Sequence, residues 1–82
     1  MQNNNLDKVL EIINSFLSDT ELTCNEIDED LFQYGLDSII FIRITLMLEE
    51  SFNIDIPDDY LIMSKLNTIN KMVKLISELE KR

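Results

Sequence analysis

The sequence predicts one all-α domain, a small bundle of three main helices plus one short helix. Apolar residues recur at helical spacing in three stretches, at about 6–18, 38–51 and 69–80. A long acidic stretch rich in turn formers separates the first two, and Pro57 interrupts the chain before the third. A chain of 82 residues is long enough for one domain only, so we treat residues 1–82 as a unit.

The first helix is expected at about 6–18. Its apolar positions fall on one face at helical spacing, namely Leu6, Val9, Leu10, Ile13, Phe16 and Leu17. Asp7 and Glu11 lie early in the helix, where negative charge is favourable. Residues 1–5 are polar and are expected to be disordered, with Asn5 as a candidate N-cap.

The connection at 19–37 is unusually long for so small a domain, and such connections are usually functional or internally packed. It is rich in residues that form turns and helix caps. Its apolar residues are expected to pack it against the core; they are Ile27, Leu31, Phe32, Tyr34 and Leu36.

The second helix, at about 38–51, is apolar around most of its circumference. If the core-facing residues are Phe41, Ile44, Leu48 and Phe52, another face is left with Ile39, Ile42, Arg43, Leu46 and Glu49. This second face either packs internally, for example under the long connection, or is a docking surface.

The last third of the chain is expected to hold a short helix at about 58–63 and a final helix at about 69–80. Thr68 is a suitable N-cap for the final helix. Lys81 and Arg82 at its end complement the helix dipole.

The net charge of −9 limits the possible partners. No basic residue occurs between Lys8 and Arg43, so a large part of the chain is purely acidic. Such a field repels nucleic acid and anionic lipid and attracts basic protein surfaces. No apolar run could span a membrane, and the N-terminus does not resemble a signal peptide. We therefore expect a cytoplasmic monomer that binds neither nucleic acid nor membranes.

The usual catalytic and metal-binding signatures are missing. The chain has no histidine, which excludes a Ser-His-Asp triad and disfavours the common metal sites. It has one glycine and therefore no glycine-rich phosphate loop. The single cysteine, Cys24, lies in the long connection and is read as a spare thiol. We expect a protein that is not an enzyme and holds no metal.

One serine lies at the junction between the acidic connection and the apolar second helix. Ser38 follows Gly35, which can turn the chain, and Asp37, which can cap the helix. A phosphate ester on its hydroxyl would be stabilised by the helix dipole and by exposed backbone N–H groups.

The stretch from Leu31 to Ile56 resembles the acyl and peptidyl carrier protein family. The resemblance rests on Gly35, the tripeptide Asp37-Ser38-Ile39 at the start of an apolar helix, and the later Phe52-Asn53-Ile54-Asp55-Ile56. The order of the remaining elements extends it over nearly the whole chain.

This resemblance implies that Ser38 accepts 4′-phosphopantetheine from coenzyme A, in a reaction catalysed by a separate phosphopantetheinyl transferase. The arm would carry acyl, aminoacyl or peptidyl groups as thioesters, from a loading enzyme (adenylating or acyl-transferring) to a downstream synthase, condensing or tailoring enzyme. Asp37 would cap the helix or contact the transferase's metal ion. Ile39, Ile42, Leu46 and Glu49 match positions on the family's partner-facing side.

Arg43 indicates which kind of carrier the chain resembles. Fatty-acid carriers usually have an acidic residue at this position, whereas this chain has a basic one. Arg43 and the apolar Ile40 and Phe41 favour a free-standing peptidyl carrier, or a specialised acyl carrier of nonribosomal peptide or polyketide metabolism. A fatty-acid carrier and the D-alanyl carrier of cell-wall modification are alternatives. From other classes, a non-catalytic helical adaptor and a small enzyme using the carboxylates of 55–59 are further alternatives.

Overall fold

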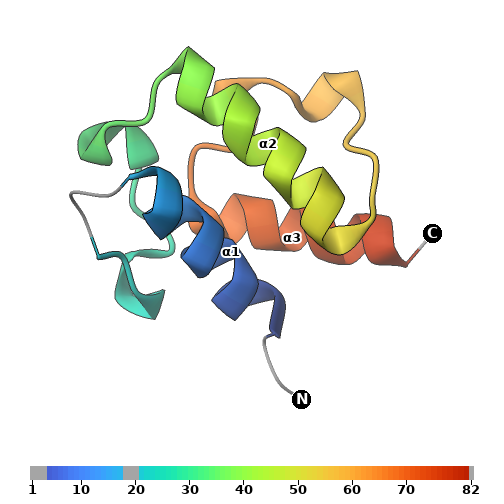
Figure 1. Ribbon diagram of the computed structural model, residues 1–82, viewed down its shortest axis with the longest axis horizontal. Helices are drawn as coiled ribbons and strands as arrows, with labels where there is room; N and C mark the ends of the chain where they lie inside the picture. Colours follow the sequence, from blue (N-terminus) through green and yellow to red (C-terminus); the bar gives the residue numbers. More distant parts are fainter. Residues whose placement is uncertain (1–3, 18–20, 82) are drawn as a thin grey trace.

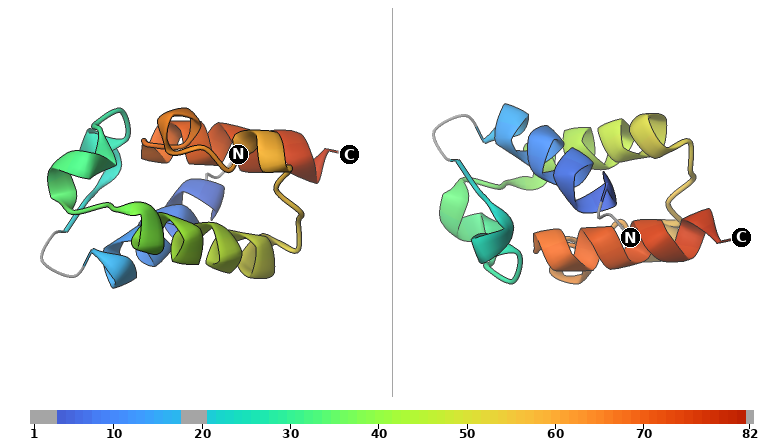
Figure 2. Two further views of the ribbon diagram at one scale, coloured as in Figure 1. Left: turned by 90° about the horizontal axis from the view of Figure 1, so that it is seen from above. Right: turned by 90° about the horizontal axis from the view of Figure 1, so that it is seen from below.

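Within the part of the chain that the structure describes, three α-helices are present, and their positions agree with the predicted all-α fold (Figure 1). The computed structural model describes residues 4–17 and 21–81. The helices are α1 (Asn4–Phe16), α2 (Ser38–Phe52) and α3 (Ile69–Glu80). Seen edge-on, α1 and α2 form one layer, and α3 with the segment before it forms the other (Figure 2). Helix α1 packs against both α2 and α3.

Helix α1 begins at Asn4, earlier than the sequence predicted. Asn5 therefore lies inside the helix instead of capping it, and its side-chain amide donates to Glu80 Oε1 of α3 at 3.0 Å. The expectation of disorder for residues 1–3 lies outside the described residues. At the other end α1 stops at Phe16, and residue 18, where the predicted helix ended, is also outside them.

The core lies between the two layers and is built from one face of each helix. Helix α2 contributes Phe41, Ile44 and Leu48, as the predicted helical register required. The other buried apolar side chains include Val9, Ile13, Leu17, Leu31, Leu66, Ile69, Met72 and Ile76. This face of α2 is therefore buried in the core, where α2 packs against α1.

The long connection contains two 3₁₀ turns, Cys24–Glu26 and Leu31–Tyr34. Leu31 and Leu36 are buried and Tyr34 is half-buried, as predicted, whereas Phe32 is exposed. Backbone hydrogen bonds join the connection to the start of α3: Leu31 N donates to Asn67 O, and Asn70 N donates to Ile27 O, both at 2.8 Å. The connection is thus part of the fold and not a loose loop.

A side chain of α1 also anchors this connection. The Asn14 amide donates from Nδ2 to Leu22 O at 3.0 Å, and its Oδ1 accepts from Leu22 N at 2.8 Å. The amide therefore pairs with the backbone of Leu22 as a neighbouring strand would.

The short helix expected at about 58–63 is instead two 3₁₀ turns, Asp58–Tyr60 and Met63–Lys65. Pro57 precedes the first turn and supplies no side-chain cap, and Leu61 leaves helical geometry with a ψ of 47°. Leu61 and Ile62, between the turns, are exposed. We call residues 57–66 the α2–α3 connection; it faces α2 with some residues and α3 with others.

No helix within residues 4–17 and 21–81 is long and apolar enough to cross a membrane.

Two isoleucines of α2 test this packing, because they have the same side chain on opposite faces. Ile44 is 0% exposed and Ile42 is 55% exposed. Ile44→Ala should lower the free energy of unfolding by about 3 kcal/mol, since it removes buried methylenes and leaves a cavity. Ile42→Ala should lower it by less than about 1 kcal/mol. Urea denaturation followed by circular dichroism measures both, and equal losses would contradict this orientation of α2.

Candidate functional site

Ser38 is the first residue of α2, and its side chain is exposed. Asp37 is the N-cap: its Oδ1 accepts from Ile40 N at 2.9 Å, and its carbonyl accepts from Phe41 N at 2.8 Å. The cap satisfies one of the amides that the first turn of a helix leaves without an intrahelical acceptor. It also fixes the backbone on which the serine hydroxyl is held.

Gly35 turns the chain just before this site. Its φ of 103° lies in the left-handed region, where a side chain is strained, and it ends the turn Leu31–Tyr34. A Cβ at this position would meet nothing closer than Leu17 Cδ2 at 3.9 Å, so glycine is required by conformation and not by space. After the turn Leu36 is buried, so the chain is anchored immediately before Asp37 and Ser38.

Three apolar side chains of α2 follow Ser38 on the solvent side; we call Ile39, Ile42 and Leu46 the α2 stripe. They are 66%, 55% and 55% exposed, respectively. The alternative of internal packing is therefore wrong for these three residues. Arg43 is also exposed and, within the part of the chain that the structure describes, forms no ion pair.

A groove of about 410 Å³ begins at Ser38 and runs beside the α2 stripe. One wall is α2 from Ser38 to Glu49, and the other is Leu61, Ile62 and Met63 of the α2–α3 connection. We call it the serine groove. Thr45 in its wall is buried, and its hydroxyl donates back to Ile42 O at 2.8 Å, so the groove surface is mostly apolar.

Glu49 lies at the far end of the serine groove and is half-buried. Its Oε2 accepts a hydrogen bond from Ile56 N at 2.8 Å. Glu49 therefore fixes the chain after α2 to the end of the helix, a role that the sequence analysis did not identify. Glu49 and Ile56 are seven residues apart, and this spacing matches no sequence pattern that would predict the hydrogen bond.

The connection that precedes Ser38 along the chain is acidic. Asp30 caps the turn Leu31–Tyr34 by accepting from Phe32 N at 3.0 Å, and Glu26 and Glu29 precede it. Partial burial, together with Glu29 and Glu26, raises the pKa of the Tyr34 hydroxyl above its ordinary value of 10.0. Tyr34 is therefore neutral at physiological pH.

No cluster of potential metal ligands is present among the residues that the structure describes. Cys24 is exposed at the start of a 3₁₀ turn of the long connection.

Comparison with known proteins identifies relatives of the same size. A family model described as phosphopantetheine attachment site matches residues 7–76, which include Ser38. The chain is similar to the D-alanyl carrier protein of Lactobacillus helveticus (strain DPC 4571), with 36% identity over 73 residues, 88% of this chain and 90% of the relative. It is also similar to the D-alanyl carrier protein of Leuconostoc mesenteroides, with 32% identity over 74 residues, 89% and 92% of the two chains.

The Asp37 cap can be tested without any partner. Asp37→Ala should lower the free energy of unfolding by about 1 kcal/mol, because Ile40 N loses its acceptor, whereas Asp37→Asn should cost only a few tenths. Asp55→Ala, which removes an exposed carboxylate elsewhere, is the control for the change in net charge. Urea denaturation measures all three, and equal effects of the Ala and Asn substitutions at residue 37 would show that the cap contributes nothing.

Proposed function

Because the chain belongs to the family of proteins with a phosphopantetheine attachment site, we propose that Ser38 is the attachment residue and D-alanine the cargo. The carrier role and the covalently attached 4′-phosphopantetheine follow from the family. The observation that carries the rest of the proposal is an exposed serine, on the first turn of α2, beside an exposed apolar stripe.

The surroundings of Ser38 fit a phosphodiester. Its hydroxyl is exposed on the first turn of a helix of 15 residues. The first-turn amides that Asp37 does not satisfy point toward the N-terminal end, where the dipole favours negative charge. A phosphate on Ser38 Oγ would therefore lie at the end of α2 that favours negative charge.

We expect attachment to require a separate phosphopantetheinyl transferase, because within residues 4–17 and 21–81 no side chain accepts a hydrogen bond from the Ser38 hydroxyl and could take its proton. Ser38 Oγ would form the new P–O bond while the pyrophosphate bond of coenzyme A breaks and adenosine 3′,5′-bisphosphate leaves. The hydroxyl proton passes to a base of the transferase. Asp37 uses Oδ1 for the cap, so Oδ2 is the oxygen available to a metal ion of the transferase.

The attached arm supplies a terminal thiol that holds the cargo as a thioester. The chain itself holds the arm at a fixed place and presents the α2 stripe to successive partners. Charge steering speeds their encounter, and a small apolar contact fixes orientation without slowing release. Tethering keeps the cargo at roughly millimolar effective concentration near each active site. The protein catalyses neither loading nor delivery. A cytoplasmic location is part of this proposal, because there the coenzyme A pool is available.

D-Alanine is favoured over other cargo because relatives that match over about nine-tenths of their own length include D-alanyl carrier proteins. The exposed Arg43 beside the α2 stripe fits an aminoacyl or peptidyl carrier equally well. A carrier of nonribosomal peptide or polyketide synthesis is therefore the second candidate, and loading with a defined amino acid distinguishes the two.

Attachment at Ser38 is tested by intact mass. After incubation with coenzyme A, magnesium and a broad-specificity phosphopantetheinyl transferase, the wild-type protein should gain one phosphopantetheine. Ser38→Ala should gain none, because the attacking hydroxyl is gone. Modification of the variant would place the attachment elsewhere. No gain by the wild type, under conditions that modify a known carrier, would favour the helical adaptor, for which Ser38→Ala is functionally silent.

Cargo and partner recognition are tested with the phosphopantetheinylated protein, ATP and an adenylating enzyme that activates D-alanine. The protein should gain one alanyl group, and Arg43→Glu should lower kcat/KM for loading roughly tenfold, because it reverses a charge at the docking surface. Attachment of the arm to the variant should change by less than about twofold.

Lys81→Glu is the matched control, since it makes the same change of charge at the end of α3. Loading by enzymes specific for L-amino acids, without loading by the D-alanine enzyme, would favour the peptidyl carrier. If Arg43→Glu loads like wild type, Arg43 is not a recognition residue.

A further inference from the structure

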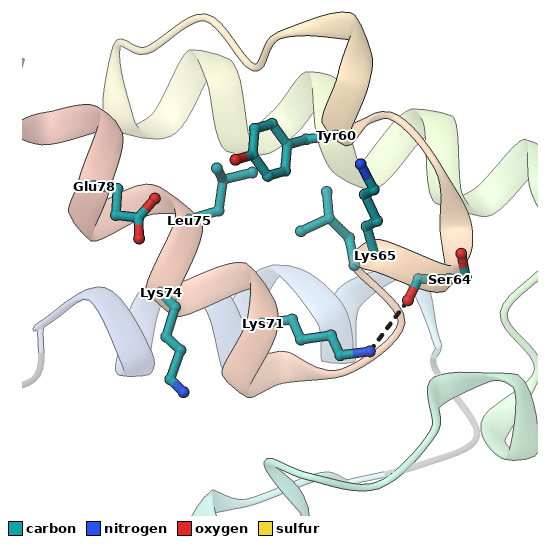
Figure 3. A pocket seen from close by; sticks show the side chains of 8 residues that line it. Tyr60, Ser64, Lys65, Lys71, Lys74, Leu75 and Glu78 are labelled. Atoms are coloured by element: carbon teal, nitrogen blue, oxygen red, sulfur yellow. Dashed lines mark hydrogen bonds between the residues drawn. The ribbon is translucent and has the colours of Figure 1, made fainter.

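A second groove lies on the other side of the α2–α3 connection, between this connection and α3 (Figure 3). Its volume is about 420 Å³. Leu66 and Leu75, both buried, and the half-buried Tyr60 form its apolar surface. Lys65, Lys71 and Lys74 are among its lining residues, with the Lys74 side chain extending away from Tyr60 and Leu75, and Glu78 lies at one end (Figure 3). We call it the lysine groove; it shares no lining residue with the serine groove.

The charge of this groove is opposite to that of the chain as a whole. Three of the seven basic residues line it, in a protein of net charge −9. Positive charges dispersed over the surface would keep the protein soluble equally well. Solubility therefore does not explain why three lysines line one groove.

The three ammonium groups are not neutralised by the protein. Lys71 Nζ donates to two neutral acceptors, Ser64 O at 3.1 Å and Asn67 Oδ1 at 2.9 Å. Lys65 Nζ lies 5.5 Å from the centre of the Tyr60 ring. Within residues 4–17 and 21–81, none of the three lysines forms an ion pair with a carboxylate. Two of the cations are thus held in place by contacts that leave their charge available.

We propose that the lysine groove is a second docking site, which binds an acidic peptide segment of a partner protein with one apolar side chain at its centre. The apolar side chain would contact Tyr60, Leu66 and Leu75, and flanking carboxylates would pair with the lysines. This surface is distinct from the α2 stripe, so the carrier can be held by one partner while Ser38 serves another.

A peptide segment fits this groove better than a membrane surface does. The lysines line a concavity, which an inserted side chain can enter and a flat bilayer cannot. An anionic bilayer extends beyond the groove and would also be repelled by the field of a protein of net charge −9, whereas a narrow segment contacts the groove alone.

The proposal is tested by titrating ¹⁵N-labelled full-length protein with a synthetic peptide in which one phenylalanine is flanked on both sides by aspartate and glutamate. Backbone amide shifts should be saturable and confined to residues 60–66 and 71–78, and they should weaken with added salt. Replacing the acidic residues of the peptide by their amides, or its phenylalanine by alanine, should each weaken binding.

Two double variants decide whether the groove or overall charge is responsible. Lys65→Gln with Lys74→Gln should raise the Kd roughly fivefold to tenfold, because two charge pairs are lost. Lys8→Gln with Lys81→Gln should leave the Kd nearly unchanged. This control removes the same charge. Lys8 Nζ lies 5.5 Å from the centre of the Phe52 ring, and Lys65 Nζ lies 5.5 Å from the centre of the Tyr60 ring, so both double variants lose one such contact.

Several results would overturn the proposal. They are equal weakening in both double variants, shifts that map to the α2 stripe, or no saturable shifts at all. Binding to phosphatidylglycerol vesicles that depends on Lys65 and Lys74, without peptide binding, would assign the groove to a membrane instead. Concentration-dependent dimerisation lost in the Lys65/Lys74 variant would assign it to a second copy of the chain.

Discussion

Phe41, Ile44 and Leu48 attach α2 to the core, and the rotation of this helix about its own axis follows from their burial. That rotation decides which apolar residues remain outside: Ile39, Ile42 and Leu46 lie on the solvent side. The N-terminal end of the helix is fixed separately, by the left-handed Gly35, the buried Leu36 and the Asp37 cap. Together these constraints place an exposed hydroxyl at the head of an exposed apolar surface, which is the geometry that a carrier requires.

The sequence predicted those parts of the structure that depend on local patterns. Helical periodicity located α2 and α3 and the core face of α2, and cap chemistry identified Asp37 and Thr68, whose Oγ1 accepts from Lys71 N at 3.1 Å. The apolar face that remained on α2 had two interpretations in the sequence, because periodicity does not say how many neighbours a helix has. Only the packed structure shows that Ile39 and Ile42 remain exposed.

Features that depend on contacts between distant residues were not predictable. The pairing of Asn14 with Leu22 and of Glu49 with Ile56 uses polar side chains that look like ordinary surface residues in the sequence. The predicted cap at Asn5 was wrong because α1 extends to Asn4 and uses Asn5 to contact α3 instead. The lysine groove was missed because its lysines come from two elements, and only the α2–α3 connection brings Lys65 beside Lys71.

Helix α2 has a buried face that stabilises the fold and an exposed face that, under the proposed function, contacts partner enzymes. Ile44 is buried in the core, while Ile42, two positions earlier, is exposed where a partner protein can reach it and contributes little to the core. Mutation can therefore explore new specificities along the solvent side of α2 without passing through unfolded variants. After a gene duplication, one copy could therefore change its exposed face and acquire different partner enzymes while its buried face keeps the fold. The same separation would help to redirect a carrier to new enzymes in the laboratory.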